Sequence, residues 1–141
     1  MEVRCVELGS ADYQATLGLR QAVLLEPFGI ALETACADDE QAVHLAAFED
    51  ARCVACLLLI DRGGGSWQLR QMAVTPELQR RGIGQRLVAF ALSWAREAGA
   101  VSLMAHAREP AVGFYERAGF SVEGEPYVKV GLPHRTVVIA L

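Results

Sequence analysis

The chain has 141 residues, 52% of them hydrophobic, and a formal net charge of −4 at pH 7. Such a composition excludes an intrinsically disordered chain, and mild acidity without a lysine- or arginine-rich run argues against a nucleic-acid partner. No apolar run reaches the roughly 20 residues that span a bilayer, and the start of the chain lacks the pattern of a signal peptide. We therefore expect a single domain over residues 1–141, cytoplasmic, with no membrane or nucleic-acid partner.

The first part of the chain predicts a strand, a helix and a polar connection. Residues 2–8 alternate apolar and polar side chains, which is typical of a strand with one buried face. Ser10 suits the N-cap of a helix whose apolar stripe continues to about Leu25, before Pro27 breaks it. Residues 35–40 are then expected to form an acidic connection to the next strand.

Three strands of an antiparallel meander are predicted next, over residues 41–49, 52–61 and 67–74. Tight or glycine-rich turns at residues 50–51 and 62–66 join them. The second strand is almost continuously apolar, as expected at the centre of a sheet.

The cysteines do not predict a metal site or a disulfide. Cys53 and Cys56 have the C-x-x-C spacing, but on a strand residues three apart point to opposite faces and cannot share one tetrahedral metal. Cys5 and Cys36 stand alone, and no second cysteine or histidine pair follows at metal spacing. We expect buried or incidental thiols and no metal.

The turn that follows the third strand of the meander predicts an anion site. Pro76 stops the strand, and residues 79–84 then lead into a helix. A glycine-rich turn that opens a helix leaves backbone N–H groups unpaired at the positive end of the helix dipole, which suits phosphate. Gly82 and Gly84 would let a phosphate approach the backbone closely. The other common phosphate-binding glycine motifs are absent.

Gln79-x-x-Gly82-x-Gly84, after a strand that ends Met72-Ala73-Val74, resembles the acetyl-CoA motif of the GNAT N-acetyltransferase superfamily. The resemblance implies that the loop and the helix N-terminus hold the CoA pyrophosphate, and that the strand pairs with the pantetheine arm. The alternation of side chains is interrupted at residues 72–74, which is consistent with a bulge. In the family, a break in strand pairing here exposes an N–H that polarises the thioester carbonyl. The implied cofactor-binding residues are Met72, Ala73, Val74, Gln79, Arg80, Arg81, Gly82, Ile83, Gly84, Gln85 and, from a second motif, Phe114.

The cofactor helix is predicted from about Gly82 to Glu97, with Gly99 as its C-terminal cap. A strand over residues 101–106 follows, and strand-helix-strand implies a parallel crossover. The expected core-facing side of the helix is Ile83, Leu87, Phe90, Ala91, Trp94 and Ala98.

Residues 108–120 contain the second motif, A-x-x-F-Y-x-x-x-G-F, on a helix that Pro110 begins and Gly119 ends. The block is similar to the second GNAT signature and stands in the family's order. The resemblance implies that Tyr115 gives a proton to the CoA thiolate, for which a phenol is a suitable acid. The alternative is that Tyr115 only packs in the core. Arg108 stands where many family members have an asparagine.

Residues 120–130 and 135–141 predict two last strands, joined by the turn G-L-P-H at residues 131–134. The general base is left open, because the strand over residues 67–74 contains no carboxylate. Histidines are candidates because they titrate near neutral pH, and His134 is favoured by its place in the turn. The candidates are His44, His106 and His134.

Together these features imply an α+β (α/β) GNAT-like fold, with a mixed, mostly antiparallel sheet of about six to seven strands flanked by helices. The implied function is an N-acetyltransferase that transfers acetyl directly from acetyl-CoA, its co-substrate, to a primary amine of a small molecule. The alternatives are a lysine or N-terminal acetyltransferase of proteins or peptides, and a non-catalytic acyl-CoA sensor. Similar proteins are often dimers, so a homodimer is left open.

Overall fold

The computed structural model describes residues 1–141 and contains seven strands and four α-helices. The strands are β1 (Glu2–Val6), β2 (Val43–Glu49), β3 (Arg52–Asp61), β4 (Ser66–Val74), β5 (Ser102–Arg108), β6 (Ser121–Lys129) and β7 (Leu132–Ala140). The helices are α1 (Ala11–Arg20), α2 (Leu32–Ala35), α3 (Ile83–Glu97) and α4 (Val112–Arg117). A π-helical turn (Gln21–Leu25) extends α1, and 3-10 turns lie at Glu26–Phe28, Asp39–Gln41, Pro76–Leu78 and Glu109–Ala111.

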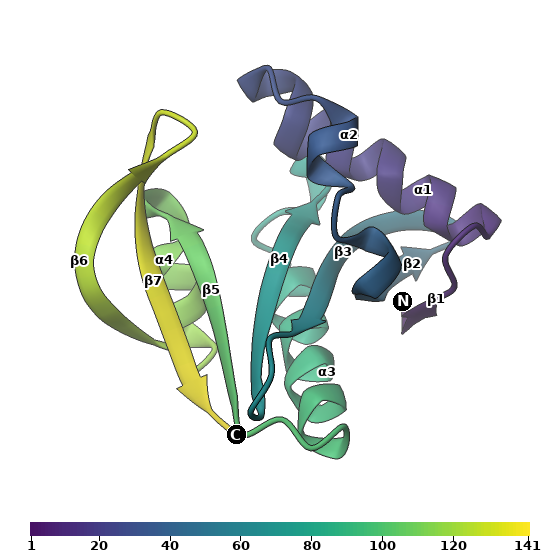
Figure 1. The fold of residues 1–141 in the computed structure, drawn as a ribbon. Coiled ribbons are helices and arrows are strands. Elements are labelled where there is room, and N and C mark those ends of the chain that lie inside the picture. The colour runs from purple at the N-terminus through teal and green to yellow at the C-terminus, as the bar shows by residue number, and fades with distance from the viewer.

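All seven strands form one sheet in the order β1-β2-β3-β4-β5-β7-β6 (Figure 1). Every neighbouring pair is antiparallel except β4 and β5, which α3 connects as a parallel crossover. The expected mixed, mostly antiparallel α+β fold is therefore confirmed. None of the helices combines the length and the apolar composition that a membrane-spanning segment needs.

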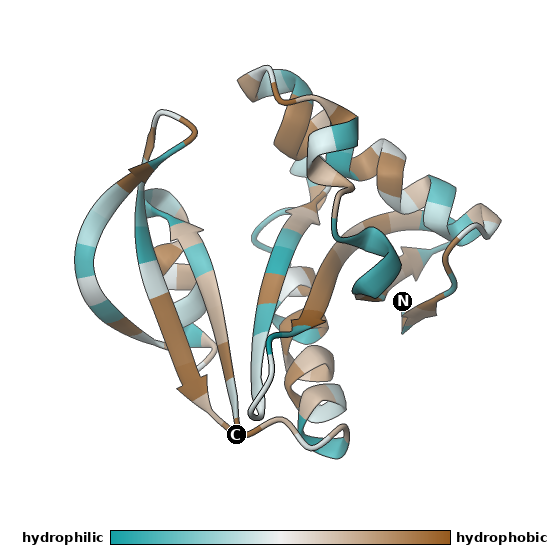
Figure 2. Cartoon of the chain, viewed as in Figure 1, coloured by the Kyte–Doolittle hydropathy of each residue, from teal (hydrophilic) through white to brown (hydrophobic).

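The core consists of two apolar clusters, one on each face of the sheet. The larger cluster of 20 buried residues lies beneath α3 and α4 and includes Leu45, Leu57 and Leu87. The smaller cluster of 7 residues lies beneath α1 and includes Tyr13 and Phe48. β3 is buried on both faces, between the two apolar clusters, and its sequence is almost continuously apolar. Figure 2 shows this strand in the colour of hydrophobic residues.

The N-terminal helix begins and ends as predicted. The Ser10 hydroxyl accepts a hydrogen bond from the Tyr13 N–H at 3.1 Å, which satisfies one of the free donors of the first turn. The helical path continues to Leu25, and Gly29 then adopts the left-handed conformation with φ of 66°. Residues 35–40 were expected only as a connection, but they include the end of α2 and a turn that buries Asp39.

The prediction that Cys53 and Cys56 point to opposite faces is wrong. Ala47 pairs with Ala55, whereas Phe48 pairs with Cys53, so β3 contains one extra residue at this point. A bulge of one residue reverses the alternation of side chains, and both thiols therefore lie in the smaller apolar cluster. All four cysteines are free.

The buried side of α3 differs from the predicted one. The helix buries the expected Ile83, Leu87 and Ala91, and it also buries Gly84, Val88, Leu92 and Ala95. Of the other expected residues, Phe90 and Trp94 are half-buried and Ala98 is exposed. Trp94 lies at the margin of the interface, edge-on to Trp67 with ring centroids 5.7 Å apart. Gly99 caps the helix as predicted, with φ of 90° and its N–H donating to the Arg96 carbonyl.

The last hairpin turns earlier than predicted. Val130 and Gly131 both have positive φ and form the turn, so β7 begins at Leu132 and His134 lies on a strand. Pro133 is tolerated because β5 ends opposite His134, and the missing proline N–H therefore has no partner to lose on that side.

Candidate active site

The parallel pair β4 and β5 separates along its length. Pairing covers only the four residue pairs from Ser66–Ser102 to Leu69–Ala105, and the strands then diverge (Figure 1). The remaining residues of β4, from Arg70 to Val74, have no β5 partner. The backbone groups of β4 that face β5 are therefore free past Leu69.

A bulge lies on β4 where this separation begins. Leu58 pairs with Arg70 and Cys56 pairs with Ala73, so three steps on β4 oppose two on β3. Gln71 adopts a φ of 53°, which is a rare conformation for a residue with a side chain. The predicted bulge is confirmed, and it turns the backbone next to Met72.

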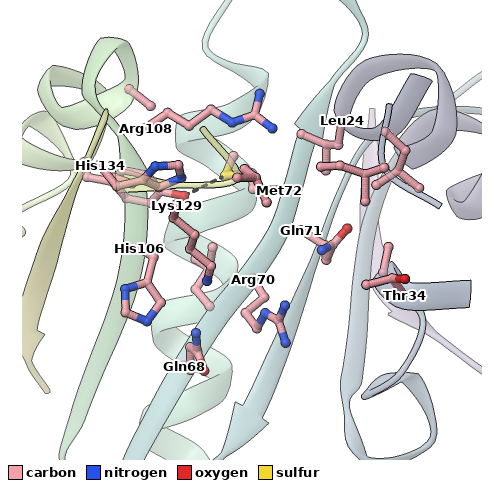
Figure 3. A pocket seen from close by; sticks show the side chains of 18 residues that line it. Leu24, Thr34, Gln68, Arg70, Gln71, Met72, His106, Arg108, Lys129 and His134 are labelled. Carbon is pink, nitrogen blue, oxygen red and sulfur yellow. Dashed lines mark hydrogen bonds between the residues drawn. The ribbon is translucent and has the colours of Figure 1, made fainter. Parts of the chain in front are cut away.

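A cavity of about 450 Å³ lies in the opening between the two strands. Figure 3 shows residues of β4 and β5 on its walls, with Leu24 and Thr34 from the α1–α2 region on one side and His134 from β7 on the other. Its size is typical of a site for a small molecule. The fold thus places the α1–α2 segment and the β6–β7 hairpin around one chamber.

Tyr115 lies on the cavity wall as a buried side chain. It is 6% exposed and packs edge-on against Phe114 and Phe120. The hydroxyl's only hydrogen-bond partner is the Met72 sulfur, 3.9 Å away. Burial raises the pKa of Tyr115 well above its usual value, so the phenol is protonated. A buried hydroxyl with only a weak thioether acceptor is ready to donate to a ligand.

His134 also lines the cavity and is 5% exposed. Its Nδ1 lies 2.8 Å from the Leu132 carbonyl oxygen, and because that oxygen can only accept, Nδ1 must donate. In the neutral ring this leaves Nε2 as a free acceptor. Tyr127 stacks on the ring with centroids 6.0 Å apart, which holds its orientation.

The other two histidines differ in position. His106 lines the cavity and shares a hydrogen bond between its Nδ1 and the Tyr127 hydroxyl. His44 is buried beneath α1, where its Nε2 lies 2.8 Å from the Asp39 carbonyl oxygen. His44 is not among the cavity residues, so the structure brings together only two of the three candidate bases.

The loop before α3 has the geometry of an uncapped helix N-terminus. Arg80 and Gly82 have φ of 67° and 80°, and no side chain caps the first turn, which also contains no acidic residue. Arg80, Arg81 and Gly82 are exposed, and a Cβ on Gly82 would meet nothing within 4 Å. The free N–H groups and the two arginines make this terminus suited to an anion.

Side-chain contacts hold this loop and helix against the rest of the site. The Gln79 amide donates to the Val74 carbonyl at 3.1 Å, and the Gln85 amide donates to the Phe114 carbonyl at 3.0 Å. Ile83 and Ala73 are buried in the two apolar clusters, so only their backbones are open to a ligand.

Gly84 has a packing role. A Cβ there would lie 3.0 Å from the Phe114 Cε1 and 3.3 Å from the Met72 Cε. The two glycines of the motif are therefore needed for different reasons, positive φ at Gly82 and close packing at Gly84.

A buried ion pair beneath the site was not foreseen. Arg20 is fully buried and donates to both carboxylate oxygens of Asp39, at 2.8 and 3.1 Å, and to the Ala35 carbonyl. The Tyr13 hydroxyl donates to the same carboxylate at 2.5 Å. These bonds fix the α2 segment over the cavity. The recurrence of Tyr13, Thr16 and Arg20 at helical spacing was the available signal, because all three face inward.

The comparisons with known proteins agree with this geometry. The profile of the acetyltransferase (GNAT) family matches residues 11–120. A Lactobacillus plantarum protein proposed to be an N-acetyltransferase has a TM-score of 0.87 at 23% identity, with 100% of this chain and 99% of that chain covered. Escherichia coli ElaA has a TM-score of 0.85 at 19% identity, with 98% and 99% covered. A GNAT family acetyltransferase of Elizabethkingia anophelis, solved with acetyl-CoA bound, has a TM-score of 0.79 at 15% identity, with 99% and 97% covered.

A search of curated proteins finds no significant match. The fold and the opened strand pair define an acyltransferase of the GNAT type, and the profile match covers most of the chain. The chain belongs to the acetyltransferase (GNAT) family.

Proposed function

We propose that the protein transfers an acetyl group from acetyl-CoA to a primary amine of a small molecule. The observation that carries the proposal is that two groups line the same cavity, the protonated hydroxyl of Tyr115 and the acceptor Nε2 of His134. A donor and an acceptor of protons are what acetyl transfer from a thioester to an amine requires.

The residues fit acetyl-CoA at three places. The uncapped N-terminus of α3, with Arg80 and Arg81, suits the pyrophosphate, and Gly82 leaves open space there. The free edge of β4 at residues 70–74 suits the amide groups of the pantetheine arm. The Tyr115 hydroxyl, without a strong acceptor of its own, suits the sulfur. When bound, acetyl-CoA supplies an activated acyl group with a thiolate leaving group.

In the reaction, the lone pair of the neutral amine forms the C–N bond to the acetyl carbon, and the C–S bond breaks with its electron pair on sulfur. His134 accepts the proton that the amine loses. Tyr115 gives its proton to the thiolate, which leaves as free thiol. Free backbone N–H groups of β4 near the bulge would stabilise the developing oxyanion, and donors of this kind contribute about 3 kcal/mol in other acyl-transfer enzymes.

The experiment is acetyl-CoA binding by calorimetry, followed by thiol release with a panel of primary amines. We expect selective binding of acetyl-CoA and CoA over ATP, and thiol release that depends on the amine. Binding of CoA without thiol release from any amine or peptide would indicate a sensor. Release only with peptides would indicate a protein acetyltransferase, and absence of CoA binding would contradict the proposal.

A further inference from the structure

The cavity wall is positively charged, although the whole chain has a net charge of −4. Of the 18 residues that line it, Arg70, Arg108 and Lys129 are basic, His106 and His134 are histidines, and none is an aspartate or glutamate. The net charge of the chain therefore does not describe the chamber that receives the acceptor.

Two of the three cations have no carboxylate partner. Arg70 donates to Asp38, which lies outside the cavity wall and neutralises part of its charge. Arg108 is half-buried and rests on the Phe28 ring, with its guanidinium carbon 3.9 Å from the ring centroid, and it forms no ion pair. Lys129 forms no ion pair either.

These charges repel one another across the opening. Figure 3 shows the Lys129 ammonium between the His106 ring and the Arg70 guanidinium. Partial burial and then the charge of Arg70 lower the pKa of Lys129. Burial and then the charges of Lys129 and Arg70 lower the pKa of His106. An anion in the chamber would offset this repulsion between the cations.

We propose that the acceptor is a small amine that also carries an anionic group, a carboxylate or a phosphate, and that Lys129 and Arg108 bind this group. The inference rests on the proposed function for the identity of the reacting amine, but not for the presence of the anion site. Lys129 comes from the end of β6 and Arg108 from the end of β5, so the two cations approach the chamber from separate strands.

The cations are not required for the phosphates of acetyl-CoA. The loop before α3 has its own two arginines and an uncapped helix N-terminus. The cavity that contains Lys129 and Arg108 is lined by Leu24 and Thr34 of the α1–α2 region and by no residue of that loop. Lys129 and Arg108 are therefore available to bind the anionic group of the acceptor.

The test compares amines in matched pairs that differ only in the anionic group. An α-amino acid is compared with its carboxamide, and phosphoethanolamine with ethanolamine, while a polyamine serves as a cationic acceptor. We expect the acidic member of at least one pair to have a kcat/KM about tenfold higher, because a charge-assisted hydrogen bond is lost with the anion. A preference in the amino-acid pair would identify the anionic group as a carboxylate, and a preference in the phosphoethanolamine pair would identify it as a phosphate.

Substitutions of Lys129 and Arg108 test whether these two residues cause the preference for the acidic amine. Lys129→Gln should raise the KM for the preferred acidic amine about tenfold, with little change in kcat or in acetyl-CoA affinity, because only the anion contact is lost. Arg108→Gln should act in the same direction, and Lys129→Arg should keep most of the affinity. Arg96→Gln, on the exposed side of α3, removes one positive charge elsewhere and serves as the matched control.

Binding of the same pairs by calorimetry, with CoA present, separates this inference from the proposed function. Transfer that proceeds equally well with carboxamides, ethanolamine or polyamines would overturn the anion site and leave the acetyltransferase. Acids that bind in a Lys129-dependent way without any thiol release would uphold the anion site and contradict the transfer. A loss of acetyl-CoA affinity in Lys129→Gln as large as the loss of acceptor affinity would overturn the inference, since the cation would then serve CoA.

Discussion

The Tyr115 hydroxyl lies 3.9 Å from the Met72 sulfur, and this contact joins α4 to the bulge of β4. The two residues are far apart in the sequence and belong to the two separate motifs. Their contact lies at the cavity, next to the point where β4 loses its β5 partner. The proposed proton donor therefore lies against the strand segment that turns the backbone at the bulge.

Removal of the Tyr115 hydroxyl should affect turnover alone. In Tyr115→Phe we expect kcat to fall about 100-fold or more, which is the usual contribution of a general acid. Acetyl-CoA affinity and the melting temperature should change little, because the hydroxyl has only a thioether as a partner. Steady-state kinetics, calorimetry and thermal unfolding measure the three quantities. Unchanged turnover would remove Tyr115 from the mechanism.

Loss of His134 should reduce turnover in a way that depends on pH. We expect His134→Ala to lower kcat on the order of 100-fold at about pH 7, and less at about pH 9, where the amine needs less help to lose its proton. His106→Ala is the matched comparison, because that ring also lines the cavity. An unaltered rate over this range would exclude His134 as the base, and a larger effect in His106→Ala would assign the role to that ring.

Alanine at either glycine of the motif, Gly82 or Gly84, should destabilise the protein, for a different reason at each position. Gly84→Ala introduces a Cβ within 3.0 Å of the Phe114 ring, so we expect the free energy of unfolding to fall; overpacking typically costs about 1–3 kcal/mol. Gly82→Ala meets open space but requires a φ of 80°, a strain of about 1–2 kcal/mol. Urea denaturation measures both changes in the free energy of unfolding. Calorimetry measures whether each variant still binds CoA. A stabilised Gly84→Ala would contradict the packing described here.

The buried Arg20–Asp39 pair should govern stability on the acid side. Burial acts to raise the pKa of Asp39, but hydrogen bonds from Arg20 and Tyr13 outweigh it and hold the pKa below its usual value. A lowered pKa gives stability that is present above the ordinary aspartate pKa of about 3.9 and is lost as pH falls through the folded-state value.

We expect Asp39→Asn to lower the free energy of unfolding by about 3 kcal/mol near neutral pH, because Arg20 is left buried without its counter-charge. The difference from the parent protein should begin to shrink as the pH falls below about 4, where Asp39 of the unfolded chain takes up a proton, and it should disappear as the pH reaches the lower pKa of the folded carboxylate. Urea titrations across this pH range measure both effects. Glu40→Gln, at an exposed neighbouring carboxylate, is the control and should change little.

The cysteines should differ in their reactivity with a thiol reagent, which also sets the background of any thiol-release assay. Burial raises the pKa of Cys53 to about 11 and that of Cys56 further still, so neither forms thiolate readily. Cys5 is exposed. At about pH 8 we expect rapid modification of Cys5 and modification of Cys53 and Cys56 only after denaturation. Fast reaction of the last two in the native protein would contradict their burial.

Local patterns were sufficient for most of the fold. The Ser10 cap, the Gly99 cap, the meander and the strand-helix-strand crossover all follow from spacing of a few residues, and all are present. The bulge on β4 could also be anticipated, since the apolar alternation breaks there. The prediction from alternation failed where one extra residue shifted the pairing of two strands, as at the β3 bulge beside Cys53.

The chemistry of the site was only partly contained in local sequence. The two motifs indicated Tyr115 and the phosphate loop, because both depend on residues close together in the chain. His134 was expected in a turn and lies on β7, and His44 was a candidate but lies under α1. No local pattern brings Lys129 of β6 to the chamber beside Arg70 of β4 and Arg108 of β5.

The order of helices and strands could therefore be predicted from short-range periodicity, glycines and prolines, and the class of reaction from the resemblance of the two motifs to the GNAT family. The charge of the cavity and the burial of Arg20 against Asp39 depended on which strands and helices meet in space. Such contacts join residues distant in the chain, and they form only when sheet pairing and burial of apolar surface fix the relative positions of the elements.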